Sequence, residues 1–369
     1  MNKLIGIVAT NYSLGDFGLL TEERPIASIP YGGRYRLIDF PLSNIVNAGV
    51  TLVGVITPYL YRSILDHIGN GKPWNLSRKN EGLFVLPGTV YGYDTGKGKL
   101  MLRDIRGNKM FLERSNADYV VVACCNKIFN IDYEAVLDKH IKSGAGVTIC
   151  YKKMETTVAK DELAVFVDND DNLLDLKRLK KNSHNMNMCL DTMIINKDLL
   201  LKILTLYENQ SYVDLFDVIK ENIEHLAVAG YEFKGYVKSI NNVHDFMVAN
   251  KELLNEEVLN DLFLQDRMIY TKIHDAHPVR YSKESEVHNS IIATGSVIKG
   301  KVTNSIIFRN CVIEEGAVVK NCVIMQKSYI PKGTHVENMI CDKGVTLSEG
   351  VRICGTEAKP IIITSHQYK

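Results

Sequence analysis

The chain has 369 residues and a net charge of +1, with 46% hydrophobic and 24% charged residues. This length suits two domains of roughly 100–200 residues each, and the composition is typical of a globular protein. Because the charge is balanced, a surface built for nucleic acid is not expected. No stretch approaches the roughly 18 apolar residues of a membrane span, so a membrane partner is not expected either.

The cysteine pattern favours a reducing compartment. The eight cysteines show no C-x-x-C spacing, and Cys124 and Cys125 are adjacent. We interpret them as reduced, buried thiols of a cytoplasmic protein rather than as zinc ligands or disulfides. Residues 1–13 contain a short apolar run that is typical of a first strand and not of a signal peptide.

Strand and helix patterns alternate along the first two-thirds of the chain. Continuous apolar runs and helical spacing predict strands and helices in the order 4–9 (strand), 39–48 (helix), 52–57 (strand), 118–123 (strand), 133–143 (helix) and 147–151 (strand). Antiparallel strands are predicted over 163–195, followed by helices at 199–207, 212–225 and 243–259. This order predicts a Rossmann-like α/β domain over 1–260, with a mixed, mostly parallel sheet, and a linker over 261–285.

The last part of the chain, 286–369, carries a hexapeptide repeat. Aliphatic residues recur every six positions within three runs: Ile292 and Ile298; Ile307, Ile313 and Val319; and Ile324, Ile330 and Val336. This period predicts a left-handed parallel β-helix in which each unit points one aliphatic side chain inward. An ordinary β-sandwich is the alternative, but a period of two does not explain repeated sixes.

Residues 24–49 carry a family resemblance. They read RPIASIPYGGRYRLIDFPLSNIVNAG, which resembles the start of bacterial glucose-1-phosphate adenylyltransferases (ADP-glucose pyrophosphorylases). The resemblance is looser over 235–250 and architectural in the repeats. It implies a nucleotidyltransferase domain and the conversion of ATP and glucose-1-phosphate to ADP-glucose and pyrophosphate. That chemistry needs a glycine-rich phosphate loop, a lysine and carboxylates that hold Mg²⁺.

Those chemical groups are absent from the matching positions. The family's lysine corresponds to Ile26, and its two metal carboxylates correspond to Asn126, beside Lys127, and to Ser239. The glycine-rich loop corresponds to 10–20, which lacks the paired glycines and any lysine or arginine, and the sugar-phosphate motif corresponds to 177–180. The resemblance therefore implies eroded catalytic and metal positions, with no catalytic residue, no bound metal and no cofactor in this chain.

This pattern is similar to the non-catalytic, regulatory subunit that some Gram-positive bacteria pair with a catalytic homologue. It implies a regulatory subunit of glucose-1-phosphate adenylyltransferase in glycogen biosynthesis, in a homo- or hetero-tetramer, with Mg²⁺ held by the catalytic partner. Arg34 lies where some family members place a lysine that contacts a sugar-phosphate activator. Arg34 and Arg36 are thus candidate effector-binding residues, although a solvated surface arginine is the simpler interpretation of Arg34.

Two other functions remain open: a divergent active sugar-phosphate nucleotidyltransferase, and a homo-oligomeric sugar-phosphate sensor without a catalytic partner. Hexapeptide helices also occur in acyltransferases, where a catalytic histidine lies between coils. Within the repeats that chemistry is open only to His288 and His335. We interpret both as solvent-facing or spacer residues, and we interpret 92–99 as a flexible loop rather than a phosphate loop.

Overall fold

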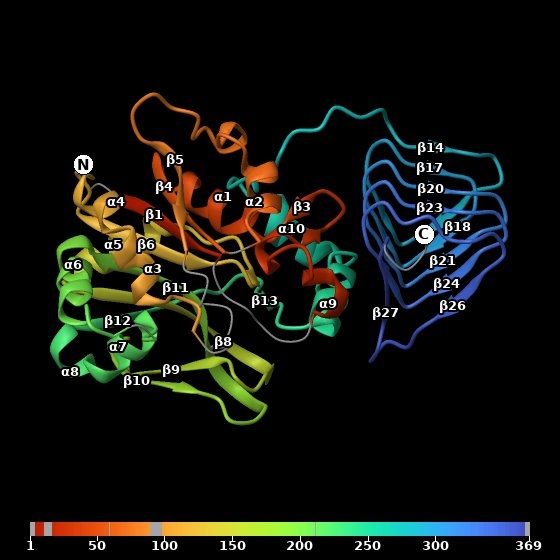
Figure 1. Ribbon diagram of the computed structural model, residues 1–369. Helices are drawn as coiled ribbons and strands as arrows, with labels where there is room; N and C mark the ends of the chain where they lie inside the picture. Colours follow the sequence, from red (N-terminus) through yellow and green to blue (C-terminus); the bar gives the residue numbers. More distant parts are fainter. Residues whose placement is uncertain (1–3, 11–16, 59, 89–97, 211, 366–369) are drawn as a thin grey trace. The chain divides into compact units, whose positions relative to one another are not determined.

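The computed structural model describes residues 4–10, 17–58, 60–88, 98–210 and 212–365 (Figure 1). The contacts divide the chain into two compact units, neither of them contiguous in sequence. Unit 1 draws on 1–13, 38–237 and 266–270, and unit 2 on 14–37, 238–265 and 271–369. The predicted division at residues 260 and 286 stays a prediction. Among the described residues, no helix is long and apolar enough to cross a membrane.

Unit 1 is built on a nine-stranded mixed sheet. Its main path is β10-β9-β11-β6-β1-β4-β5, and β8 pairs with β11 and β12. The strands are β1 (Leu4–Ala9), β4 (Leu52–Thr57), β5 (Gly82–Pro87), β6 (Tyr119–Cys124), β8 (Val147–Val158), β9 (Leu163–Val167), β10 (Leu173–Arg178), β11 (Ser183–Asn196) and β12 (Val228–Glu232). Strands β1, β4, β5 and β6 run parallel, whereas β11 is antiparallel to β6, β8 and β9. The predicted mixed, mostly parallel sheet is confirmed.

Helices follow the strands as the sequence predicts for most of unit 1. They are α1 (Asp39–Asn47), α2 (Arg62–Ile68), α3 (Leu102–Gly107), α4 (Lys109–Glu113), α5 (Tyr133–Ser143), α6 (Lys197–Leu206), α7 (Leu215–Glu221) and α8 (Ile223–Leu226), with a 3-10 turn η3 (Lys72–Trp74) and a short strand β7 (Lys127–Ile128). Helix α5 begins where the Asp132 carboxylate accepts two backbone N–H groups and ends at Gly144, whose φ is +64°. The single helix predicted over 212–225 is wrong, because the chain breaks at Asn222 into α7 and α8.

The C-terminal part of unit 2 is a stack of coils with three flat parallel sheets, shown in blue in Figure 1. The first sheet contains β14 (Arg280–Tyr281), β17 (Val297–Ile298), β20 (Val312–Ile313) and β23 (Tyr329–Ile330). The second contains β15 (Glu286–His288), β18 (Lys301–Thr303), β21 (Val318–Lys320), β24 (His335–Glu337) and β26 (Arg352–Cys354). The third contains β16 (Ile291–Ile292), β19 (Ile306–Ile307), β22 (Val323–Ile324), β25 (Met339–Cys341) and β27 (Ile361–Ile363).

The repeat prediction is confirmed residue by residue. The aliphatic residues spaced by six, among them Ile298, Ile313 and Val319, form one buried core between the three sheets. Each Å² of apolar surface that is buried stabilises the fold by about 25 cal/mol. A single coil cannot bury its inward-facing side chains, so this stabilisation requires several stacked coils. The parallel pairing begins at Arg280, ahead of residue 286 where the repeats were predicted to start.

The rest of unit 2 contains a hairpin and two helices. Its elements are η1 (Gly18–Thr21), η2 (Ile26–Ser28), β2 (Pro30–Tyr31), β3 (Tyr35–Arg36), β13 (Lys238–Ser239), α9 (Val243–Glu252) and α10 (Glu256–Phe263). Gly32 and Gly33 turn the hairpin with φ of +58° and +81°, and the Gly32 N–H donates to Asn250 Oδ1 at 3.0 Å. The single helix predicted over 243–259 is wrong. It is interrupted before Asn255, whose side chain caps α10.

Candidate functional site

The carboxyl edge of the parallel strands in unit 1 is the place where an α/β sheet commonly binds its ligand. Strands β1 and β6 end there side by side, with Ala9 paired to Cys124. The chain then turns through Cys125 and Asn126 and enters β7 at Lys127. Asn126 is fully buried and the Lys127 side chain is 1% exposed. A positive charge is thus buried directly after Asn126, the position predicted to correspond to a metal carboxylate.

The Lys127 ammonium group has three hydrogen-bond acceptors. Its Nζ lies 2.6 Å from Glu162 Oε2, 2.7 Å from Asp191 Oδ2 and 2.7 Å from the Cys189 carbonyl oxygen. An ammonium group has three protons to donate, so all of its donors are satisfied. The carboxylates of Glu162 and Asp191 are themselves buried, with side chains 2% and 4% exposed.

A second lysine completes this cluster. Lys99 Nζ lies 2.5 Å from Asp191 Oδ2, so a single carboxylate oxygen accepts hydrogen bonds from two ammonium groups. We call Lys99, Lys127, Glu162 and Asp191 the buried ion network. It contains two positive and two negative groups, and its formal charges cancel. Buried charges are tolerated only when they are paired and hydrogen-bonded in this way.

The pKa values follow from burial and from these pairings. Burial alone would raise the pKa of Asp191, but the charges of Lys127 and Lys99 outweigh it and hold that pKa well below its usual range. The pKa of Glu162 is lowered because the Lys127 charge likewise exceeds the effect of burial. Burial would lower the pKa of Lys127, yet the charges of Asp191 and Glu162 raise it. These three groups are therefore all ionised at neutral pH.

Asp191 is held in an unusual backbone conformation. Its φ is +53°, in the left-handed region, and the pairing of β11 with β8 is irregular between Cys189 and Met193. Such a conformation costs about 1–3 kcal/mol in a residue other than glycine and is commonly found at functional sites. The irregularity turns the carboxylate toward two lysines, so the ion pairs offset the backbone strain.

A further buried carboxylate positions the Lys99 backbone. Asp214 Oδ2 accepts N–H groups from Lys99 at 2.7 Å and Leu100 at 2.9 Å, while its Oδ1 accepts the Phe216 N–H at 2.8 Å and caps α7. Burial raises the pKa of Asp214 to about 6, although these hydrogen bonds oppose the shift. Asp214 thus fixes the chain from which Lys99 reaches Asp191.

The positions predicted to be eroded lie in both units. Asn126 belongs to unit 1, whereas Ile26 and Ser239 belong to unit 2. Ile26 is 4% exposed within η2, and Ser239 is half-buried in β13. Residues 11–16 of the segment predicted to correspond to the family's glycine-rich loop lie outside the described residues, as do residues 92–97 of the predicted flexible loop 92–99. Lys177, in the predicted sugar-phosphate segment, is a surface residue paired with Asp175 at 2.9 Å.

The two candidate effector residues lie on the β2–β3 hairpin of unit 2. Arg34 is exposed, and its guanidinium carbon lies 5.2 Å from the centroid of the Tyr35 ring. Arg36 is half-buried in β3. Both are therefore placed by the same tight turn, which is the local structure that the Gly32-Gly33 pair predicts.

Arg36 takes part in a group of cations that we call the Arg24 cluster, formed by Arg24, Arg36 and Lys343. Arg24 is buried, donates from Nε to the Leu20 carbonyl at 2.8 Å and pairs with Asp342. Burial lowers the pKa of Lys343, and the charges of Arg24 and Arg36 lower it further against the opposing effects of Asp342 and Glu23. The cluster thus brings three cations together with the carboxylates of Asp342 and Glu23.

Sequence reasoning identified only one member of the buried ion network. Lys127 stood out as a cation beside Asn126, while Lys99, Glu162, Asp191 and the adjoining Asp214 were missed. A signal was present at Asp191, because it lies in the stretch Cys189–Ile195, in which five of the seven residues are apolar. A charge inside a buried strand needs a partner of opposite sign, although the sequence does not say which residue that partner is.

An α/β unit combined with C-terminal hexapeptide coils is typical of nucleotidyltransferases that carry a β-helix. The "Nucleotidyl transferase" family matches residues 19–160, and the "GlmU-like, C-terminal hexapeptide" family matches residues 275–359. The chain is 31% identical to "Glycogen biosynthesis protein GlgD" of Bacillus subtilis, over 98% of this chain and 96% of that protein.

Two further relatives agree with this match. The GlgD protein of Geobacillus stearothermophilus is 34% identical over 86% of this chain and 83% of that protein. "Glucose-1-phosphate adenylyltransferase" of Fervidobacterium nodosum is 30% identical over 96% of this chain and 86% of that protein. The chain belongs to the bacterial glucose-1-phosphate adenylyltransferase family, and within it to the GlgD type.

Proposed function

We propose that this chain is a non-catalytic, regulatory subunit of glucose-1-phosphate adenylyltransferase in glycogen biosynthesis. It assembles with a catalytic homologue in the cytoplasm, as part of a tetramer, and changes that partner's activity or its response to an effector. Membership in the GlgD type supports the pathway, because the matched relatives are named for glycogen biosynthesis. The buried ion network supports the absence of catalysis.

The observation that carries this proposal is the pairing of Lys127 with Glu162 and Asp191. Nucleotidyl transfer needs Mg²⁺ and cationic groups that neutralise the phosphates. Mg²⁺ requires oxygen ligands at about 2.0–2.1 Å, but Glu162 Oε2 and Asp191 Oδ2 each accept a hydrogen bond from a buried ammonium group. A divalent cation brought to these oxygens would meet Lys99 and Lys127 as like charges. The residues of this edge therefore do not fit Mg²⁺, which is left to the catalytic partner.

The residues at the three predicted eroded positions also support the absence of catalysis. Ile26 is buried and apolar, so it cannot neutralise a phosphoryl group, and Asn126 offers a neutral amide in place of a carboxylate. The Ser239 hydroxyl brings no negative charge. In the alignment that the resemblance implies, these three substitutions remove the charge of the catalytic lysine and of both metal carboxylates. We therefore propose that the chain contributes subunit contacts and not turnover.

The Arg24 cluster supports a regulatory role through an anionic effector. Arginine guanidinium groups bind phosphate through paired, charge-assisted hydrogen bonds. Arg36 lies in this cluster with Lys343, and the exposed Arg34 lies two residues away on the same hairpin. We propose that a sugar phosphate binds here and that its binding is coupled to the partner's activity through subunit contacts.

The test compares ADP-glucose synthesis by three samples: this chain alone, a catalytic homologue from the same genome alone, and the two co-expressed. We expect no synthesis by the chain alone, and a rise in kcat or a fall in KM when the two are co-expressed. Turnover by this chain alone would instead establish a divergent transferase. Co-expression that changes neither the partner's kinetics nor its elution volume on size-exclusion chromatography would contradict the regulatory proposal and favour a sugar-phosphate sensor.

A further inference from the structure

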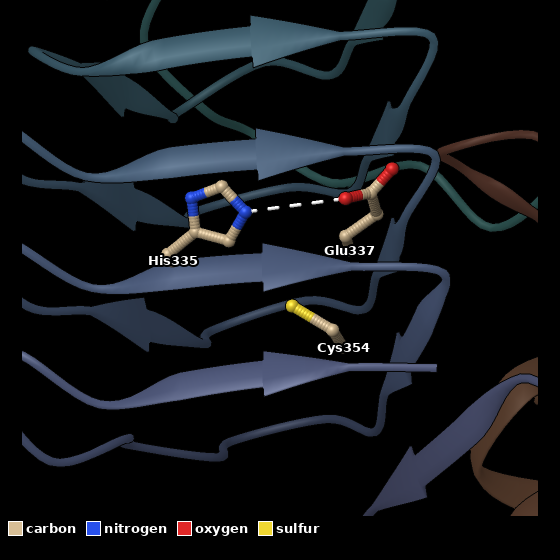
Figure 2. Close-up of side chains that lie close together, drawn as sticks. All are labelled: His335, Glu337 and Cys354. Carbon is tan, nitrogen blue, oxygen red and sulfur yellow. Dashed lines mark ion pairs between the residues drawn. The ribbon is translucent and has the colours of Figure 1, made fainter. Parts of the chain in front are cut away.

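The outer face of the second β-helix sheet carries a cluster of three metal-ligating side chains. His335 and Glu337 lie on β24, and Cys354 lies on β26 in the next coil. Figure 2 shows the imidazole and the carboxylate facing each other, with the sulfur of Cys354 directed toward them from the neighbouring strand. One ligand atom from each residue lies within 4.8 Å of the other two.

The register of the β-helix brings these residues together. His335 and Glu337 are two positions apart on one strand, so their side chains share the outer face while Val336 points into the core. The parallel pairing of β24 with β26 sets Cys354 directly beside Glu337. Strand pairing thus brings Cys354 next to Glu337, which is 17 residues earlier in the chain, and near His335, which is 19 residues earlier.

We propose that His335, Glu337 and Cys354 form a zinc-binding site that links two successive coils of the β-helix. Thiolate sulfur, imidazole nitrogen and carboxylate oxygen are the three ligand types that Zn²⁺ uses, and three protein ligands leave the fourth position to water. Zinc bonds of about 2.0–2.3 Å in a tetrahedral site place two ligand atoms about 3.3–3.8 Å apart. Side-chain rotations that bring the three ligand atoms about 1 Å closer together therefore close the site.

The polar contacts around the cluster leave the ligand atoms available. Lys320 pairs with Glu337 through Oε1 at 2.8 Å, whereas the other oxygen, Oε2, faces His335 Nε2 at 4.0 Å. Within the described part of the chain, the buried Nε2 of His335 has no hydrogen-bond partner. An unsatisfied buried nitrogen is costly unless a ligand completes it. Zinc between Nε2 and Oε2 would satisfy both atoms while Lys320 keeps the carboxylate oriented.

Cys354 differs from the other cysteines of the chain, and the prediction of a buried thiol is wrong for it. The remaining seven are buried, and Cys354 alone is exposed. Burial raises the pKa of several of those thiols, for example Cys322 to about 12, so they remain protonated. When zinc binds, the Cys354 thiol loses its proton to water and the sulfur forms the metal bond, so affinity rises with pH. The thiolate and the Glu337 carboxylate together balance the two positive charges of the ion.

The ligand set distinguishes zinc from the metal of the nucleotidyl transfer reaction. Mg²⁺ prefers oxygen ligands in an octahedral arrangement, and this cluster offers a single carboxylate. The site also lies wholly within unit 2, on one sheet of the β-helix. The inference is thus independent of the proposed regulatory function.

The test uses the full-length, tag-free chain after treatment with a chelator. Zn²⁺ is titrated by calorimetry, and Co²⁺ is added in parallel because a sulfur-to-cobalt charge-transfer band reports a thiolate ligand. We expect one zinc ion per chain, weakened at least tenfold by Cys354→Ser and by His335→Gln, with loss of the cobalt band in Cys354→Ser. Excess Mg²⁺ should not displace the ion.

A matched control lies on the same sheet face. His288 lies on β15, in the lateral position that Glu337 and Cys354 occupy on β24 and β26, and His288→Gln should leave zinc binding unchanged. Circular dichroism confirms that each variant is folded. A second readout is alkylation of Cys354, which zinc should slow in the wild type. Unchanged zinc affinity in Cys354→Ser, or alkylation that zinc does not slow, would overturn the proposal.

Discussion

Two groups of cations among the described residues differ in how their charge is balanced. In unit 1, Lys99 and Lys127 are paired with Glu162 and Asp191, and the four formal charges cancel. In unit 2, the three cations of the Arg24 cluster are accompanied by the carboxylates of Asp342 and Glu23, and Arg24 and Arg36 lower the pKa of Lys343. The charge of the first group is balanced within the group, which disfavours a further cation there. The second group has one more cation than carboxylates, and we propose that it is the group that binds an anionic effector.

The largest effect is expected from breaking the buried ion network. Lys127→Met removes a buried ammonium group and leaves the network with two carboxylates and a single ammonium group. An uncompensated buried charge costs about 3–5 kcal/mol, so the free energy of unfolding should fall by about that amount. Urea denaturation followed by circular dichroism measures it. Lys109→Met is the matched control, because the Lys109–Glu113 pair is exposed and should contribute little. Equal stability of Lys127→Met and wild type would show that the network is not held as described.

The same network predicts how stability depends on pH. The pKa values of Asp191 and Glu162 are lowered in the folded state. Their contribution is therefore complete above the unfolded pKa values of about 4 and is lost as the pH falls toward the folded values. Asp214 acts in the opposite direction, because its pKa is raised to about 6. Its contribution is present below about 4 and disappears as the pH rises through 6.

Unfolding free energies measured in urea from pH 7 down to pH 3 check this expectation. The wild type should lose stability on the acid side more steeply than Asp191→Asn, since the variant lacks one of the two carboxylates with a lowered pKa. Parallel acid profiles for the two proteins would mean that Asp191 is not ionised in the folded state.

The β-helix could be predicted from the sequence, whereas most of the buried ion network could not. The β-helix was predictable because aliphatic residues recur at a period of six. This spacing alone indicates that Ile298, Ile313 and Val319 are buried. The buried ion network was not, because Lys99, Lys127, Glu162 and Asp191 come from four separate segments and no local pattern links them. Asp191 also depends on a positive φ in the middle of a strand, which its own residue type does not require. The cluster around His335 needed the coil register, which sets Cys354 beside Glu337.

The predicted boundaries of the helix over 243–259 were wrong for a more local reason. Apolar spacing continues through 243–259, so periodicity alone extends the helix across residues 253–255. The structure ends α9 at Glu252 and starts α10 after Asn255, because the Asn255 side chain accepts the Glu257 N–H and caps a new helix. Capping chemistry outweighs the hydrophobic period at this position.

A smaller effect is expected at the Arg24 cluster. Arg36→Ala and Lys343→Ala should each weaken the binding of a sugar bisphosphate roughly tenfold, because a hydrogen bond to a charged group contributes about 1.5–3 kcal/mol. Calorimetric titration with fructose-1,6-bisphosphate as the probe measures the affinity. Lys332→Ala is the matched control, since Lys332 pairs with Glu315 on the β-helix surface. Equal weakening by all three variants would indicate general electrostatic attraction and not a defined site.

The smallest effect is expected from restoring single charges. Ile26→Lys, Asn126→Asp and Ser239→Asp should each remain without ADP-glucose synthesis, because metal and cationic groups act as a unit in catalysis. A carboxylate introduced at position 126 would also lie beside Lys127, which would compete with Mg²⁺ for it. The triple variant shows how much of the pocket remains when it is assayed in the same way. Turnover by any single variant would mean that the remaining groups of the site are already in place.

The most direct test of the absence of catalysis is pyrophosphate release by the unmodified chain alone, supplied with Mg²⁺, ATP and glucose-1-phosphate. We expect release no faster than in a sample without protein, because the carboxylates of Glu162 and Asp191 are neutralised by Lys99 and Lys127. Mg²⁺-dependent release that scales with the concentration of the chain, and that co-purifies with it, would show instead that this protein is an enzyme in its own right.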